Sequence, residues 1–180
     1  MSSSLPQGWE EKELNHVGEI IDSLHKTPMY SQTGYPMLRV TDIKSGFIST
    51  KDTKRVSEEV YTQFTNNNRN VNKYDLIITR VGSYGNIGII NIDSKICLGQ
   101  NIALIKPKID NKYLYYSMNS FFVKEQIESR VVGTTQKTLS IKNIKEILIK
   151  YPSDINEQKR IADILSAFDD KIELNNQMNQ

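Results

Sequence analysis

The sequence predicts an α+β fold: a β-rich domain of mixed or antiparallel strands with packed helices, followed by a C-terminal helix of the coiled-coil type. Strand signals are grouped between residues 35 and 107, where β-branched residues are frequent. Helical spacing of apolar residues dominates from residue 110 onward. Because the strands are grouped and do not alternate with helices, we expect an α+β rather than an α/β arrangement.

The first 22 residues predict a turn followed by a short regular element. Pro6 and Gly8 favour a turn, and Trp9 can anchor this N-terminal segment to a core. Residues 10–22 then carry spaced apolar side chains, which predict a short helix or the approach to a strand.

Residues 35–43 predict the first well-defined strand, because apolar and β-branched residues alternate there with polar ones. A turn at residues 44–46 leads to a second short strand at residues 47–50. The Asn-rich residues 65–70 can hardly form regular structure.

A hairpin is predicted between residues 75–79 and 88–92. The loop at residues 80–86 contains two glycines, whose spacing indicates backbone positions with positive φ. Residues 101–107 predict a further strand, which Pro107 stops.

The last third of the sequence predicts helices. Residues 110–111 can cap a long helix that ends at Gly133, and Ser140 can cap a second, short helix. Tyr151-Pro152 is expected to break the chain, and a last helix is predicted from about Ile155 to the end.

Charge is unevenly distributed along the chain. Residues 29–152 carry 18 Lys and Arg against 10 Asp and Glu, a net charge of +8. Residues 1–28 and 153–180 each carry a net charge of −3. The basic middle has the electrostatic character of a polyanion-binding module, although a lysine-rich solvated surface would give the same composition.

Composition also excludes several classes of protein. No run of about 18 apolar residues predicts a membrane span, and the N-terminus has neither the basic nor the apolar region of a signal peptide. The single cysteine, Cys97, cannot form an internal disulfide and is expected to be a core residue rather than a reactive thiol. We therefore expect a cytoplasmic protein that has no membrane segment.

Motifs for catalysis are missing from the sequence. Two histidines and one cysteine give no metal-ligand cluster, and no Gly-x-Ser-x-Gly motif is present, so we expect neither a metal site nor a nucleophilic triad. The glycine-containing residues 82–88 lack the Gly-Lys-Ser/Thr ending of a P-loop. No Asn/Asp-Pro-Pro-Tyr/Phe motif of amino-methyltransferases occurs either.

A nuclease-like pattern, a carboxylate followed two residues later by Lys, recurs in this lysine-rich chain. So many matches indicate chance rather than an active site. The matches include Asp42-Ile43-Lys44, Asp52-Thr53-Lys54, Asp93-Ser94-Lys95 and Asp110-Asn111-Lys112.

Five segments, in this order and spacing, resemble the specificity subunits of Type I restriction-modification systems. Each is weak by itself, but together they are specific. They are Leu5-Pro6-x-Gly8-Trp9, residues 35–43 with Gly46-Phe47-Ile48, residues 73–85, Gly133-Thr134-Thr135-Gln136, and Glu157-Gln158-x-x-Ile161-Ala162-x-x-Leu165. Tyr74 departs from the glycine that the family usually has there. The length resembles a half-subunit with one target-recognition domain.

This resemblance implies a DNA-binding target-recognition domain at residues 1–152 and the start of a conserved spacer or dimerisation helix at residues 153–180. In the family, a modification subunit methylates adenine with S-adenosylmethionine, and a restriction subunit cuts with ATP. The resemblance therefore implies a chain with no catalytic residues and no cofactor of its own. The implied partners are double-stranded DNA, the modification subunit and, through the complex, the restriction subunit.

The predicted DNA contacts lie in three polar regions, because loop side chains contact base edges while Lys and Arg contact phosphates. The first is the hairpin loop with Arg80, Ser83, Tyr84 and Asn86; the second is Thr134, Thr135, Gln136 and Lys137; the third is Arg39, Lys44 and Arg69. Any of these could instead be a solvated polar residue. Arg80 could instead be structural, bound to Asp75 or to a carbonyl.

The C-terminal helix predicts an apolar stripe, with a spacing of three and four residues that suits a coiled-coil seam. The stripe consists of Ile161, Leu165, Phe168 and Ile172. It could pack on the chain's own domain or on a second copy, and a two-fold homodimer would recognise a symmetric, interrupted DNA sequence.

Two other functions are compatible with the same residues. The chain could be the recognition part of a fused restriction-methylation enzyme, or a basic module that binds an acidic protein. DNA binding that weakens with salt, with a log–log slope of roughly −0.9 per phosphate contact, would distinguish DNA recognition from protein binding.

Overall fold

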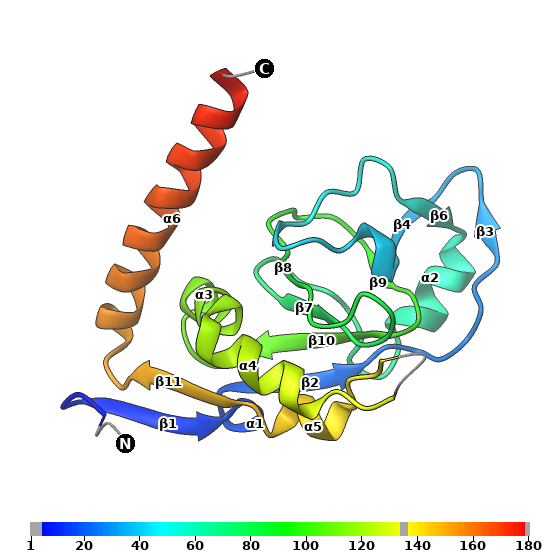
Figure 1. Cartoon of the computed structure of the whole chain (residues 1–180). Helices are drawn as coiled ribbons and strands as arrows, with labels where there is room; N and C mark the ends of the chain where they lie inside the picture. Colours follow the sequence, from blue (N-terminus) through cyan, green and yellow to red (C-terminus); the bar gives the residue numbers. More distant parts are fainter. Residues whose placement is uncertain (1–4, 134–136, 179–180) are drawn as a thin grey trace.

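The computed structural model of the chain describes residues 5–133 and 137–178. Figure 1 shows a body of short strands and helices, with the long helix α6 (Ile155–Met178) standing away from it on one side. The architecture is mixed α+β, as the sequence predicts. Three sheets form the body, of two, five and four strands within the described residues.

The two-stranded sheet joins the N-terminal segment to the base of α6. Strand β1 (Trp9–Glu13) pairs antiparallel with β11 (Leu148–Pro152), from Trp9 opposite Pro152 to Glu13 opposite Leu148. The prediction that Tyr151-Pro152 breaks the chain was wrong. Proline is tolerated here because it is the last residue of a strand in a sheet of only two, where its missing N–H interrupts no ladder. The chain breaks just beyond, before α6.

The five-stranded sheet is the centre of the body, in the order β2-β10-β7-β8-β5. Its pairs are antiparallel except β5–β8, which is parallel, so the sheet is mixed. The predicted hairpin is confirmed by the pairing of β7 with β8. The strands are β2 (Gly18–Asp22), β5 (Gly46–Phe47), β7 (Leu76–Thr79), β8 (Ile87–Ile89) and β10 (Ile102–Pro107).

Both faces of this sheet are covered, which explains why β7 and β10 are almost continuously apolar. Leu76 and Ile78 face a core cluster shared with the helices, whereas Ile77 and Leu104 face a second cluster beneath the four-stranded sheet. A strand that is buried on both faces needs apolar residues at successive positions.

The four-stranded sheet has the order β3-β6-β4-β9. Its strands are β3 (Tyr30–Ser31), β4 (Tyr35–Leu38), β6 (Lys54–Val56) and β9 (Cys97–Leu98). Strand β4 is shorter than the predicted strand at 35–43, because a 3-10 turn, η1 (Val40–Asp42), follows it. The carboxylate of Asp42 accepts from the backbone N–H of Arg39, which closes this turn.

Residues 10–22 combine both predicted alternatives: α1 (Leu14–Val17) lies between β1 and β2. Helix α2 (Glu58–Thr65), which precedes the Asn-rich turn, was not predicted. Its N-terminus is capped by Ser57, whose side chain accepts from the N–H of Val60.

The predicted long helix is two helices, α3 (Asn111–Asn119) and α4 (Phe121–Arg130). Ser120 ends α3 and caps α4 in an extended conformation, its side chain accepting from the N–H of Val123. One capping residue therefore breaks an apolar pattern that continues across it. The short helix α5 (Ile141–Lys145) is capped by Ser140, as predicted.

The buried residues support these elements. Cys97 is fully buried, and burial raises the pKa of its thiol to about 12, which confirms it as a core residue. The base of α6 is attached to the body by Gln158 and Ala162, which are both buried. The side chain of Gln158 accepts from the N–H of Asp110 at 2.9 Å and donates to the carbonyl of Pro152 at 2.7 Å.

Candidate nucleic-acid interface

The hairpin loop between β7 and β8 and the segment after α4 lie side by side. Val81 forms an antiparallel bridge with Thr138, and the N–H of Leu139 donates to the carbonyl of Arg80 at 2.8 Å. The structure thus joins two regions that the sequence predicted separately as DNA contacts. Thr134, Thr135 and Gln136 lie outside the described residues.

Tyr84 and Lys137 connect the two segments through their side chains. The ammonium of Lys137 donates to the Tyr84 hydroxyl at 3.3 Å and lies 5.6 Å from the centre of its ring. The hydroxyl in turn donates to Glu128 at 2.9 Å. Lys137 itself is exposed, so a positive charge is held at the surface beside the hairpin tip.

The backbone of the hairpin loop is defined by its glycines and by Thr79. Gly82 and Gly85 have φ values of 73° and 74°, which confirms the predicted positive φ. The Thr79 hydroxyl donates to the carbonyl of Ser83 and accepts from the N–H of Asn86. This arrangement leaves Ser83 exposed at the tip.

Asn86, by contrast, faces inward. Its amide donates to the carbonyl of Ile43 at 3.4 Å, and the side chain is half-buried. Lys44, the next residue along from Ile43, is exposed. Of this neighbouring pair, Lys44 is the better placed to contact a ligand, and DNA contact by either residue stays a prediction.

Arg80 is bound mainly to its own protein. Its Nε donates to the carbonyl of Leu139 at 3.2 Å, and its Nη1 donates to the carboxylate of Asp22. The side chain is only 11% exposed. Arg80 thus has the structural role that the sequence left open, because it is bound to a carbonyl. Its acidic partner is Asp22 and not Asp75. The carboxylate of Asp75 instead accepts from the N–H of Asn72.

Asp22 also contacts a second arginine and a histidine, and we call these four residues, Arg80 included, the Asp22 cluster. The Nε of Arg69 donates to the Asp22 carbonyl at 2.9 Å, and the ring of His25 lies 3.0 Å from the Asp22 carboxylate. His25 is also 3.4 Å from Arg80. Sequence reasoning missed Asp22, because 47 and 58 residues separate it from the two arginines.

Arg39, the remaining predicted contact, forms a bidentate ion pair with Asp42. Its Nε and Nη2 donate to the two carboxylate oxygens at 2.9 and 2.6 Å. Its side chain is 33% exposed, three times the exposed fraction of Arg80. The guanidinium is therefore held in one orientation at the surface.

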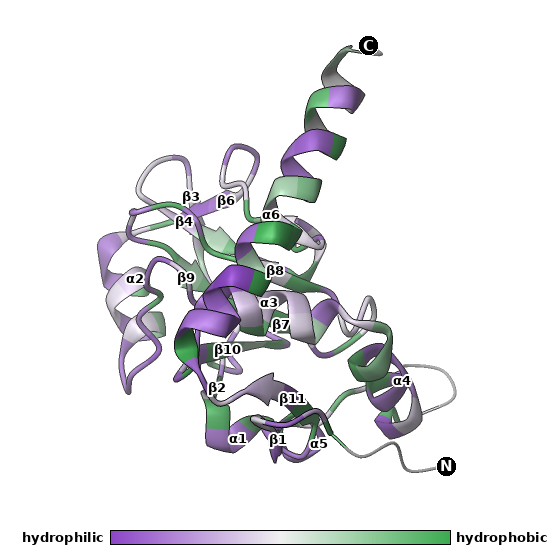
Figure 2. Cartoon of the chain, turned by 90° about the vertical axis from the view of Figure 1, so that its left-hand side faces the viewer, coloured by the Kyte–Doolittle hydropathy of each residue, from purple (hydrophilic) through white to green (hydrophobic). Residues whose placement is uncertain are grey.

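The apolar stripe of α6 is mostly uncovered. Ile161 packs against the core, but Leu165, Phe168 and Ile172 are 38%, 59% and 57% exposed. Figure 2 shows hydrophobic bands continuing up the projecting part of the helix. Packing on the chain's own domain therefore accounts for only the first residue of the predicted stripe.

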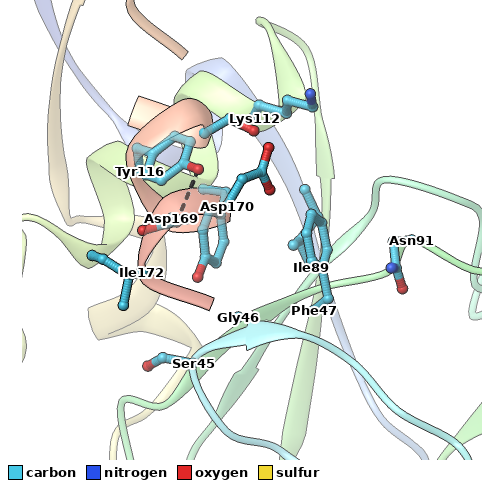
Figure 3. A pocket seen from close by; sticks show the side chains of 12 residues that line it. Ser45, Gly46, Phe47, Ile89, Asn91, Lys112, Tyr116, Asp169, Asp170 and Ile172 are labelled. Atoms are coloured by element: carbon cyan, nitrogen blue, oxygen red, sulfur yellow. Dashed lines mark hydrogen bonds between the residues drawn. The ribbon is translucent and has the colours of Figure 1, made fainter. Parts of the chain in front are cut away.

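A hollow of about 730 Å³ separates the middle of α6 from the β5 turn (Figure 3). Phe47, which is 55% exposed, stands on one side, and Ile172 on the other. Across its end, the hydroxyl of Tyr116 on α3 donates to Asp169 on α6 at 3.0 Å. Burial, with a smaller contribution from this bond, raises the pKa of Tyr116 to about 12.

Within residues 5–133 and 137–178, no group of three or more His, Cys, Asp or Glu residues could hold a metal ion. None of the helices described is long and apolar enough to cross a membrane.

Comparison with known proteins gives a consistent family. Residues 6–180 match the family model described as "Type I restriction modification DNA specificity domain". The chain is 27% identical over 179 residues to the EcoBI specificity subunit of Escherichia coli, covering 94% of this chain and 37% of that protein. It is 30% identical over 184 residues to a putative MjaX specificity subunit of Methanocaldococcus jannaschii, covering 93% and 41%.

Solved structures show the same fold. The S subunit from M. genitalium superimposes with a TM-score of 0.66 at 22% identity, covering 95% of this chain and 42% of that one. A chain from a study of type I R-M complex assembly gives a TM-score of 0.74 at 18% identity, covering 98% and 42%. The chain thus spans about two-fifths of the length of these relatives. Because the family model matches residues 6–180, nearly the whole chain, the chain belongs to the Type I restriction-modification DNA specificity domain family.

Proposed function

We propose that the chain recognises double-stranded DNA as the specificity component of a Type I restriction-modification complex. The observation that carries this proposal is the joining of the hairpin loop to the segment after α4, which places Ser83, Tyr84 and Lys137 on one surface. Two loops from distant parts of the sequence thereby form a polar surface that carries the exposed ammonium of Lys137, within a family named for DNA specificity.

In this function the side chains divide by chemistry. Exposed cations such as Lys137 and Lys44 contact phosphates and set the position of the protein on the duplex. Polar loop residues such as Ser83 contact base edges. Arg80 and Arg69 act indirectly: Arg80 holds the hairpin loop to β2 at Asp22, and Arg69 holds the Asn-rich turn after α2 to the same residue.

The chain itself is proposed to be non-catalytic. Methylation of adenine with S-adenosylmethionine and ATP-dependent cleavage belong to a modification and a restriction subunit. In this assignment the chain binds no cofactor and directs those partners to the DNA.

The exposed stripe of α6 is proposed to pair with an equivalent helix, either from a second copy or from a second domain. Leu165, Phe168 and Ile172 are apolar, exposed and at coiled-coil spacing. Pairing would place two recognition domains at a defined separation, as a bipartite target requires. Two identical copies would recognise a sequence that is symmetric about its gap.

The decisive experiment expresses the chain with its neighbouring modification subunit and maps methylated adenines in the host genome. A single interrupted motif, symmetric about its gap, is the expected result for a homodimer. An asymmetric bipartite motif would indicate a second, different recognition domain. Absence of methylation, together with failure of the two proteins to co-purify, would overturn the proposed function.

A further inference from the structure

A second hollow, of about 360 Å³, lies beside the Asp22 cluster. It is lined by Thr27, Pro28 and Tyr30, by residues 39–41, and by Gly99 and Gln100. We call it the Gln100 groove. Gln100 has no role in the sequence-based prediction of the interface.

The groove continues the surface of the hairpin loop. The N–H of Arg80 donates to the carbonyl of Asn101, next to Gln100, at 2.9 Å. His25, whose ring is 3.4 Å from Arg80, is two residues before Thr27 in the groove wall. The groove therefore adjoins the base of the hairpin loop at Arg80.

Gln100 is carried on a rigid turn. Asn101 adopts the left-handed conformation, with φ of 64°, and Gly99 donates its N–H to the carbonyl of Leu38 at 2.8 Å. A Cβ at Gly99 would lie 3.2 Å from that same carbonyl oxygen, so the close approach favours glycine. The backbone on both sides of Gln100 is thereby held against the two sheets.

The amide of Gln100 is available for a ligand. The side chain is half-buried, and none of the described residues forms a hydrogen bond with it. A glutamine amide has donors and an acceptor side by side, which match the N6 amino group and N7 of adenine in the major groove.

Arg39 supplies a guanidinium in a fixed orientation in the same groove. Asp42 binds its Nε and Nη2, which leaves Nη1 without a partner among the described residues. A guanidinium held by a carboxylate loses little conformational freedom on binding a phosphate or a guanine. On the groove wall beside it, Tyr30 has the ammonium of Lys54 4.5 Å above its ring.

We infer that the Gln100 groove is a second base-recognition site, in which the Gln100 amide contacts an adenine edge and Arg39 contacts the flanking DNA backbone. The inference rests on the proposed DNA-recognition function. It names a specificity-determining residue on a turn between β9 and β10, outside all three regions that the sequence predicted.

The test compares methylation motifs of Gln100→Ala and wild-type protein, each expressed as the full chain with the modification subunit. The variant is expected to lose discrimination at one adenine of the motif, by roughly tenfold or more, with the other positions unchanged. Gln7→Ala is the matched control, because Gln7 is exposed in the N-terminal turn beside β1. Arg39→Ala should instead weaken binding to all sequences similarly.

Gln100→Glu provides a second variant of nearly the same shape, for the case that truncation disturbs the turn. Its carboxylate can accept from the cytosine amino group but cannot pair with both adenine edge groups, so the preferred base at that position should change. A wild-type motif retained by both variants, at unchanged thermal stability, would overturn this inference alone. Failure of the wild-type protein to direct methylation would overturn the proposed function instead.

Discussion

Asp22 is the residue at which the proposed recognition surface is held together. Its carboxylate binds Arg80 and lies beside His25, and its carbonyl accepts from Arg69. Arg80 is largely buried, so removing its acidic partner leaves a charge without compensation.

We expect Asp22→Asn to lower the free energy of unfolding by about 1–3 kcal/mol, because it removes the negative charge that pairs with the largely buried Arg80. Urea denaturation measures this change. Asp52→Asn is the control, because Asp52 is exposed and forms no ion pair with a described residue. Equal stability of the two variants would show that the Asp22 cluster contributes nothing to the fold.

Lys137 provides the direct test of phosphate contact. Lys137→Ala should weaken binding to all DNA sequences similarly and reduce the log–log salt slope by about 0.9. Lys108→Ala is the matched control, because this exposed lysine follows the end of β10 that is remote from the hairpin loop. Binding curves at several salt concentrations distinguish the two, and identical slopes would remove Lys137 from the interface.

Cys97 should be unreactive in the folded protein. With the pKa raised to about 12, only about one thiol in ten thousand is ionised at pH 8, whereas an ordinary cysteine is substantially ionised there. We expect labelling by a thiol reagent to be very slow in buffer and fast in urea. The ionised fraction of the thiol grows only as the pH approaches this raised pKa. Rapid labelling of the native protein at pH 8 would therefore contradict the buried position.

At the scale of elements, α6 is fixed to the body near its base and again at Asp169. Gln158 and Ala162 are buried at the base, and among the described side chains the hydrogen bond between Tyr116 and Asp169 is the contact farthest along the helix. The direction of the helix relative to the proposed recognition surface therefore depends on few interactions. In the proposed complex, that direction helps to set the gap between the two parts of the target.

Tyr116→Phe removes this last hydrogen bond and retains the ring. We expect a loss of about 0.5–1.5 kcal/mol and faster amide hydrogen exchange around Asp169 in α6. Tyr74→Phe is the control, because Tyr74 is exposed and its hydroxyl has no hydrogen-bond partner among the described residues. Unchanged exchange in α6 would show that the helix direction is set elsewhere.

At the scale of the whole molecule, we expect the stripe of α6 to govern assembly. Phe168→Glu places a charge in the proposed seam, and we expect it to shift the protein to the monomer at micromolar concentration. Ala167→Glu is the control, because Ala167 is exposed on a different face of the helix. Light scattering measures the mass. A wild-type monomer at high micromolar concentration would contradict homodimerisation by this chain.

Local chemistry was sufficient to predict several parts of the molecule. The hairpin follows from two apolar strands and the glycines between them. Glycine is favoured there because the loop needs backbone positions with positive φ. The cap at Ser140 and the helix from Ile155 follow from spacing and capping preferences. The same local rules failed at Ser120, where an uninterrupted apolar pattern concealed a helix end.

By itself, the sequence determined the α+β class, the family, the basic middle and the apolar stripe of α6, because these depend on composition, order and short-range spacing. Only the tertiary structure decided that Arg80 is bound to Asp22, that Lys137 meets Tyr84, and that Gln100 lines the neighbouring groove. The contact of Lys137 with Tyr84 joins residues 53 positions apart, and that of Arg80 with Asp22 joins residues 58 positions apart. The place of Gln100 depends on how the sheets pack together. The partners of these residues are selected by packing, and no local pattern encodes that choice.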